Sequence, residues 1–250
     1  MNKYKYLAKN TLVFFIGSFA SKILVFLLLP LYTSVLSTSE YAISDLMNTS
    51  VNLLNMVLTL MIAEAVLRYA IDKKYDRSEV LNVGLTFIFV SSLVLGIGSL
   101  IASRMNLVKL FEGYWLQFFL LYFFYSLNYM LAGFMRGIEK VKMIAITGVI
   151  ATLVTVTSNI ILLVVFNFGI SGYITSMILS NFVSCIMYIV FGQAYKYFNF
   201  KQLNVSLMGE MIKYSFPVLI TDIAWWLNSS SDRYLVTWVL GPSEAGLLSA

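Results

Sequence analysis

Seven segments of this chain are each long and apolar enough to cross a membrane, and this feature constrains the fold more than any other. A transmembrane helix needs about 20 mostly apolar residues. The segments lie at about 11–36, 41–69, 81–103, 115–135, 143–166, 170–193 and 214–240. Because 60% of the residues are hydrophobic and 12% are charged, a soluble domain could not bury the apolar surface. The sequence predicts an all-α polytopic membrane protein with about seven transmembrane helices.

The distribution of basic residues predicts the orientation. With a cytoplasmic N-terminus, thirteen lysines and arginines lie on the cytoplasmic side, and the outer loops hold only Arg104 and Lys109. This asymmetry follows the positive-inside rule, so we expect a multi-pass protein of the cytoplasmic membrane. The net charge of +5 then reflects topology, and no nucleic-acid partner is expected.

Two octapeptides, Thr33–Glu40 and Thr237–Glu244, are identical at five of eight positions, and each closes an apolar segment. A repeat at this distance predicts two homologous halves. We expect a six-helix lobe over 1–193, a cytoplasmic inter-lobe linker over 194–213, and the incomplete start of a second lobe over 214–250.

The composition also excludes several kinds of chemistry. The chain has no histidine, which removes His-based metal sites, catalytic triads and proton relays. Cys185 is the only cysteine, so an intrachain disulfide is impossible, and no GxxxxGK phosphate loop is present. We predict that the protein is not an enzyme, with no catalytic residues, metal site or cofactor.

Charged residues inside the apolar segments are the strongest functional signal, because they are costly at mid-bilayer. The 204-residue offset of the repeat maps Ser18 and Lys22 of the first segment onto Asp222 and Trp226 of the seventh. Asp222, Trp226, Ser229 and Arg233 share one helical face. One interpretation is a central cavity in which Lys22 and Arg233 attract an anion. The other is simple pairing of Lys22 with Asp222 and of Asp232 with Arg233.

A polar stripe also runs along the second segment, at Asp45, Asn48, Asn52, Asn55 and Thr59. Helix–helix hydrogen bonds and a wet path explain it equally well. The candidate cavity-lining, substrate-binding residues are therefore Ser18, Lys22, Asn48, Asn52, Asn55, Asp222, Trp226 and Arg233. Glu64 and Arg68, one turn apart, are expected to form an ion pair at the interface. With Arg136, they are the gating or structural candidates.

Several short motifs occur at or near the ends of the predicted membrane segments. They are Asn10-Thr11-Leu12, Pro30-Leu31-Tyr32, Leu36–Tyr41, Ala65–Tyr69, Phe134–Lys142 and Phe168–Tyr173. In this order they resemble the Wzx-type polysaccharide and oligosaccharide flippases of the multidrug, oligosaccharidyl-lipid and polysaccharide exporter superfamily. The resemblance implies two six-helix lobes that work by alternating access. It implies flipping of a lipid-linked oligosaccharide for surface polysaccharide biosynthesis, with the pyrophosphate held by cavity cations. It also implies contact with membrane lipids and with a polysaccharide polymerase or other export machinery.

Other functions remain open at this point. Such flippases have roughly twice as many spans, so the chain corresponds to an N-terminal portion that we do not expect to transport alone. The alternatives are a cation-coupled multidrug-type exporter of the same superfamily and a truncated, non-functional fragment. A membrane enzyme acting on polyprenyl-phosphate sugars is disfavoured, because histidine is absent and most outer loops are short.

Overall fold

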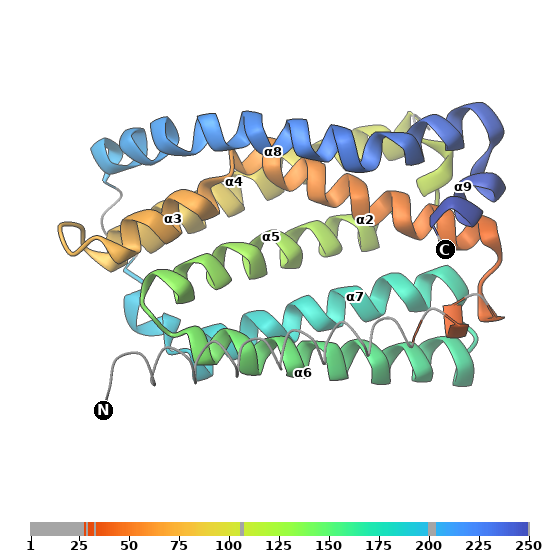
Figure 1. Ribbon diagram of the computed structural model, residues 1–250, viewed down its shortest axis with the longest axis horizontal. Helices are drawn as coiled ribbons and strands as arrows, with labels where there is room; N and C mark the ends of the chain where they lie inside the picture. The colour runs from red at the N-terminus through yellow and green to blue at the C-terminus, as the bar shows by residue number, and fades with distance from the viewer. Residues whose placement is uncertain (1–27, 29, 33, 106–107, 200–203, 250) are drawn as a thin grey trace.

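The structure is a computed structural model that describes residues 28–249 except 29, 33, 106–107 and 200–203 (Figure 1). Every regular element in these residues is helical, which confirms the all-α prediction. The α-helices are α2 (Thr38–Thr59), α3 (Ile62–Ile71), α4 (Arg77–Arg104), α5 (Trp115–Gly137), α6 (Val141–Asn159), α7 (Gly169–Ile186), α8 (Val205–Leu240) and α9 (Pro242–Ser249). Shorter elements are the 3₁₀ turns η1 (Lys109–Phe111) and η4 (Ala194–Tyr197), and the π-helical ends η2 (Ile160–Val165) and η3 (Met187–Phe191).

Four helices of the described residues are long and apolar enough to cross a membrane, and a fifth span results if α2 and α3 count as one bent segment. They match the predicted second to sixth spans. Most of the first predicted span lies outside the described residues. Helix α8 occupies the position of the seventh predicted span. It is less apolar than the other spans and is not among the helices identified as able to cross a membrane. The reason is local: the run from Asn228 to Arg233 consists of six polar residues.

Helices α2 and α3 meet at a bend of 61°. Leu60 and Met61 have left-handed backbone conformations, with φ of 52° and 53°. Side chains other than glycine rarely adopt this conformation, and no proline or glycine marks the break. The sequence therefore predicted one continuous span where the structure has two helices. The acidic Glu64 lies in the first turn of α3, where the helix dipole favours negative charge.

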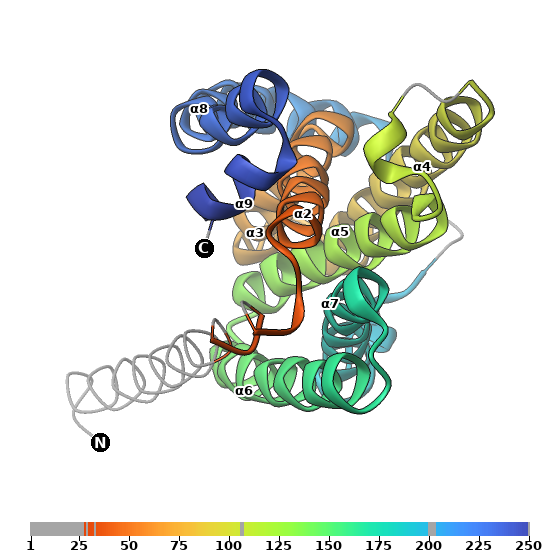
Figure 2. The same cartoon turned by 90° about the vertical axis from the view of Figure 1, so that its right-hand side faces the viewer.

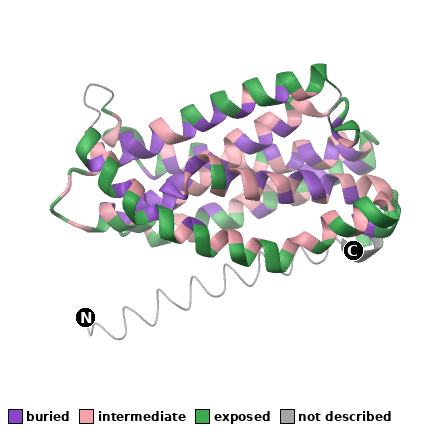
Figure 3. Ribbon diagram, turned by 90° about the horizontal axis from the view of Figure 1, so that it is seen from above, coloured by how far each residue is buried: buried purple, intermediate pink, exposed green. Residues whose placement is uncertain are grey.

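Helix α5 lies at the centre of the bundle and packs against α2, α3, α4, α6 and α7 (Figure 2). Gly133 and Gly137 form a GxxxG pair facing α3. A Cβ on Gly133 would lie 2.9 Å from the carbonyl oxygen of Ala63, and one on Gly137 would lie 2.5 Å from the Cβ of Ala70. Only glycine permits so close an approach of two helix backbones. Fully buried residues concentrate along the inner helices, whereas the outer helices expose apolar side chains (Figure 3).

The two copies of the repeat each end one helix and begin the next. In the first copy, Ser37 and Glu40 form a capping box at the start of α2. In the second, α8 ends at Gly241, whose φ is 96°, and α9 begins at Pro242. The hydroxyls of Thr38 and Ser243 lie 3.1 Å apart, so the repeated turns touch in the folded chain. This contact places α9 against α2.

At the opposite end of the bundle, the start of α8 is attached to the loop between α3 and α4 and to the first turn of α4. The hydroxyl of Tyr75 donates to Glu210 at 2.7 Å, and the side-chain amide of Asn204 donates to Glu79 at 2.9 Å. These bonds anchor α8 alongside α3 and α2, where it contacts both helices. The division into lobe, linker and second lobe stays a prediction.

Candidate functional site

A cavity of about 420 Å³ lies between α2 and α8. Its wall combines amides, hydroxyls, two indoles, a carboxylate and a guanidinium. The lining residues are Asn48, Thr49, Asn52 and Met56 of α2, and Asp222, Trp225, Trp226, Ser229, Ser230 and Arg233 of α8. In α8 these positions recur every three or four residues, which places them on one face of the helix.

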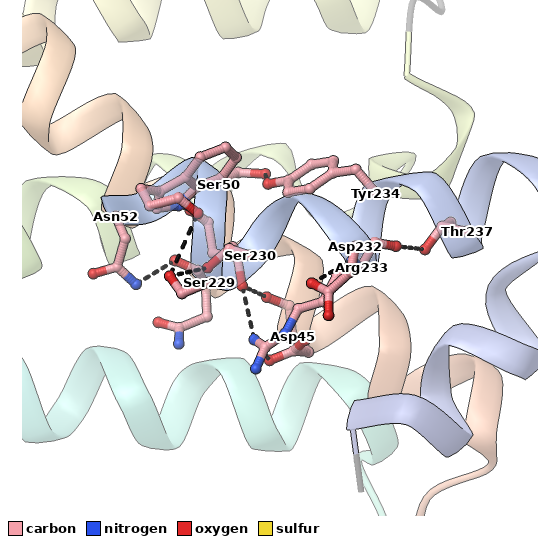
Figure 4. A network of polar contacts seen from close by, with 12 residues as sticks. Asp45, Ser50, Asn52, Ser229, Ser230, Asp232, Arg233, Tyr234 and Thr237 are labelled. Atoms are coloured by element: carbon pink, nitrogen blue, oxygen red, sulfur yellow. Dashed lines mark hydrogen bonds and ion pairs between the residues drawn. The ribbon is translucent and has the colours of Figure 1, made fainter. Parts of the chain in front are cut away.

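Arg233, in the cavity wall, forms an ion pair with Asp45. The Nη1 atom of Arg233 lies 2.8 Å from Oδ1 of Asp45, and it also donates to the hydroxyl of Thr49 at 3.3 Å. Figure 4 shows the Arg233 side chain extending from α8 toward Asp45. The exposed fractions of the two side chains are 34% for Arg233 and 18% for Asp45. The guanidinium is therefore held in place but remains accessible.

Further hydrogen bonds fix the two helices in register. The indole Nε1 of Trp226 donates to the carbonyl oxygen of Thr49 at 3.3 Å, and the hydroxyls of Ser50 and Tyr234 lie 2.8 Å apart (Figure 4). On the other side of α2, the hydroxyl of Tyr125 donates to the side-chain oxygen of Asn52. The polar stripe of α2 thus serves both purposes considered for it, since it bonds to neighbouring helices and lines a cavity.

Five of the eight candidate substrate-binding residues line this cavity: Asn48, Asn52, Asp222, Trp226 and Arg233. Asn55 does not; it is buried, and its carbonyl oxygen accepts the hydroxyl of Thr59. Ser18 and Lys22 lie outside the described residues. The clustering of the five is a fact of the structure, and their role in binding stays a prediction.

The interpretation that Arg233 forms its ion pair with Asp232 is wrong. The guanidinium binds Asp45 of α2, whereas Oδ1 of Asp232 accepts the backbone N–H of Arg233 at 2.9 Å. Neighbouring residues on a helix point in different directions, so Asp232 is turned away from the Arg233 side chain. The other proposed pair, Lys22 with Asp222, involves a residue outside the described part.

The expected ion pair between Glu64 and Arg68 does not form. Among the described residues, the ion pair present is the one between Arg233 and Asp45. Glu64 faces α5 and accepts the hydroxyl of Tyr129 at 3.0 Å. Arg68 is exposed and lines a small polar pocket with Tyr69, Asp72, Tyr75 and Tyr214. Arg136 is exposed near the end of α5. A gating or structural role for these three residues stays a prediction.

The Tyr129–Glu64 bond predicts a measurable loss of stability. Removing the hydroxyl with Tyr129→Phe leaves the part-buried carboxylate without this donor, so we expect a loss of about 0.5–1.5 kcal/mol. The midpoint of thermal unfolding in detergent should fall by a few degrees. Tyr195→Phe, which removes the hydroxyl of an exposed tyrosine, is the control. Equal midpoints for both variants and the unmodified chain would show that the bond contributes nothing.

Sequence reasoning missed several residues of the site. Trp225, Ser230 and Thr49 line the cavity beside residues that were predicted. Helical spacing from Trp226 and Asn48 predicts one narrow row of lining side chains on each helix. The cavity is wider than one row, so side chains at adjacent positions line it as well. Asp45 was visible as part of the polar stripe, although nothing in the sequence links it to Arg233. Within the described residues, no group of three or more acidic, cysteine or histidine side chains could hold a metal ion.

The chain is similar to a known protein family and to a solved structure. A family model described as "Polysaccharide biosynthesis protein" matches residues 7–250. No curated protein matches the sequence significantly. A solved structure described as "protein A" matches with a TM-score of 0.69 at 13% sequence identity, covering 98% of this chain and 59% of that chain. At this identity the likeness concerns the fold alone, and the present chain spans 59% of the length of that solved chain.

Proposed function

Because this chain belongs to the polysaccharide biosynthesis protein family, the family of the Wzx-type flippases, we propose that its cavity binds the head group of a lipid-linked oligosaccharide during export. The chain is an all-α multi-pass membrane protein, and its family is of the transporter type. The proposed activity is flipping of a polyprenyl-pyrophosphate glycan across the cytoplasmic membrane, without enzymatic chemistry. The N-terminus is proposed to lie in the cytoplasm.

The observation that carries this proposal is the mixed chemistry of the cavity between α2 and α8. An accessible guanidinium at Arg233 suits a pyrophosphate, because arginine binds phosphate oxygens through several N–H donors at once. The amides of Asn48 and Asn52 offer donors and acceptors for sugar hydroxyls. The indoles of Trp225 and Trp226 provide flat apolar surface beside them. A substrate that is anionic at one end and polar beyond it matches this arrangement.

The octapeptide repeat also relates the first predicted helix to α8. Lys22 and Ser18 correspond to Trp226 and Asp222, so the first helix is proposed to line the cavity from the other side. The lobe over 1–193 and the helix α8 after the linker would then move relative to one another in alternating access. The polyprenyl tail is proposed to stay in lipid, with membrane lipids and export machinery such as a polymerase as partners.

Cysteine accessibility tests whether the cavity is a wet, substrate-protected site. Cys185 is the only cysteine and is buried, so Cys185→Ala provides a background without reactive thiols. In that background Ser229→Cys, on the cavity wall, is expected to react with a charged, membrane-impermeant thiol reagent, because the reactive thiolate forms in water. Added lipid-linked oligosaccharide should slow the reaction.

The matched control is Leu93→Cys on α4, whose exposed apolar side chain lies in a membrane-crossing helix away from the cavity. Its thiol should react at least about tenfold more slowly, since a thiol in lipid stays protonated. Similar rates at the two positions would show that the cavity is not wet. Labelling of Ser229→Cys that the oligosaccharide leaves unchanged would argue against binding there.

A further inference from the structure

The ion pair between Asp45 and Arg233 joins α2 to α8 across 188 residues of sequence. Both hydrogen bonds that the guanidinium makes with described residues come from Nη1. A guanidinium carries five N–H donors, so toward the described residues this is a single-point contact that uses a small part of its binding capacity. A partly exposed, single-point ion pair is weak compared with a two-point contact to a phosphate.

The charges around the cavity raise a difficulty for an anionic ligand. Among the described residues, Arg233 supplies one positive charge, while Asp222 in the lining and Asp45 beside it are acidic. An incoming anion therefore meets a cation that is already paired with a carboxylate. It can bind Arg233 fully only if that carboxylate gives way.

We propose that Asp45 is a built-in competitor of the substrate, which occupies Arg233 until a diphosphate displaces it. This inference rests on the proposed function and adds a specificity-determining residue to it. A single carboxylate or a weakly charged ligand cannot outcompete Asp45, whereas a diphosphate offers more charge and several acceptor oxygens. The site thereby selects for the diphosphate.

Thr49 allows this exchange without loss of the arginine position. Its hydroxyl donates to the carbonyl oxygen of Asp45 at 2.8 Å and accepts from Nη1 of Arg233. Its carbonyl oxygen accepts the indole N–H of Trp226. These bonds do not involve the Asp45 carboxylate, so they keep α2 and α8 in register when the carboxylate moves.

Calorimetric titration of the purified protein in detergent with farnesyl diphosphate, a soluble short-chain isoprenoid diphosphate, tests this inference. Asp45→Asn removes the competing charge while preserving the shape of the side chain. We expect its Kd for farnesyl diphosphate to fall by about three- to tenfold, the range expected when a partly exposed pair and its repulsion of the ligand are lost. Asp45→Glu, which keeps the carboxylate, should stay within about twofold of the original Kd.

Asp232→Asn is the matched control. It makes the same change in net charge one residue from Arg233, but Asp232 contacts the backbone N–H of Arg233 instead of its guanidinium. Its Kd should remain within about twofold of the original, because exposed charges are well screened. An unchanged or weaker affinity in Asp45→Asn would overturn the inference while leaving the proposed function intact. If the original chain and all three variants fail to bind farnesyl diphosphate, both proposals fail together.

Discussion

In a transporter that joins this chain to a complete second lobe, replacing Arg233 by alanine is expected to reduce surface polysaccharide export in cells by at least about tenfold. The guanidinium is the positive charge that the described cavity offers to a pyrophosphate. Losing a hydrogen bond to a charged group costs about 1.5–3 kcal/mol, which corresponds to about a ten- to hundredfold loss in binding. The variant also removes the guanidinium that offsets the charge of Asp45, which adds repulsion toward an anion.

Two variants separate the position of Arg233 from its charge alone. Arg233→Lys keeps the charge but loses the planar set of donors, so we expect partial export. Lys213→Ala removes one positive charge from an exposed site on the same helix and should export normally. The amount of surface polysaccharide, normalised to the amount of protein in the membrane, is the measurement. Normal export by Arg233→Ala would exclude this cavity from the transport path.

Replacing Gly137 by valine is expected to destabilise the fold strongly. A Cβ at this position would lie 2.5 Å from the Cβ of Ala70 and 3.0 Å from the carbonyl oxygen of Leu67. Neither atom belongs to a flexible side-chain end, so relief requires α3 and α5 to separate. Overpacking of this kind costs about 3 kcal/mol, which lowers the midpoint of thermal unfolding by about 6–12 °C.

Gly98→Val is the matched control, because an added Cβ there meets no atom within 4 Å. Both changes replace a helical glycine by valine, so they share any effect on helix propensity and hydrophobicity. Gly98→Val should therefore leave the midpoint nearly unchanged. Thermal unfolding in detergent, followed by intrinsic fluorescence, measures both. Equal midpoints for the two variants would show that the close approach of α3 and α5 is not essential.

The predicted positions of the membrane segments agreed with the helices because hydropathy is a local property. Trp115–Gly137 and Gly169–Phe191, for example, fall within two residues of the predicted starts and ends. The break at Leu60 and Met61 was not predictable, because left-handed backbone at non-glycine residues is imposed by packing. In the seventh segment, polar residues lowered the mean hydropathy of the helix. Several of the same residues line the candidate site, so the feature that weakened the membrane-span prediction also indicated the site.

Three of the candidate site residues of α8 could be placed on one face from sequence alone. Asp222, Trp226 and Arg233 lie on one face of any helix formed there, since their spacing follows the helical repeat. The octapeptide repeat likewise determined that Ser37 and Gly241 occupy equivalent helix boundaries. These properties are set by residues close together in the chain or by direct similarity, and neither requires a known tertiary structure.

The packing of the helices, which local sequence cannot specify, decided which residues face this surface of α8. Arg233 meets Asp45 from 188 residues away, and the choice between Asp45 and Asp232 depends on how α8 lies against α2. It also decided that Asn48 and Asn52 border the cavity while Asn55 is buried. Helical periodicity places a side chain on a face, but the partner of that face depends on the packing of helices remote in sequence.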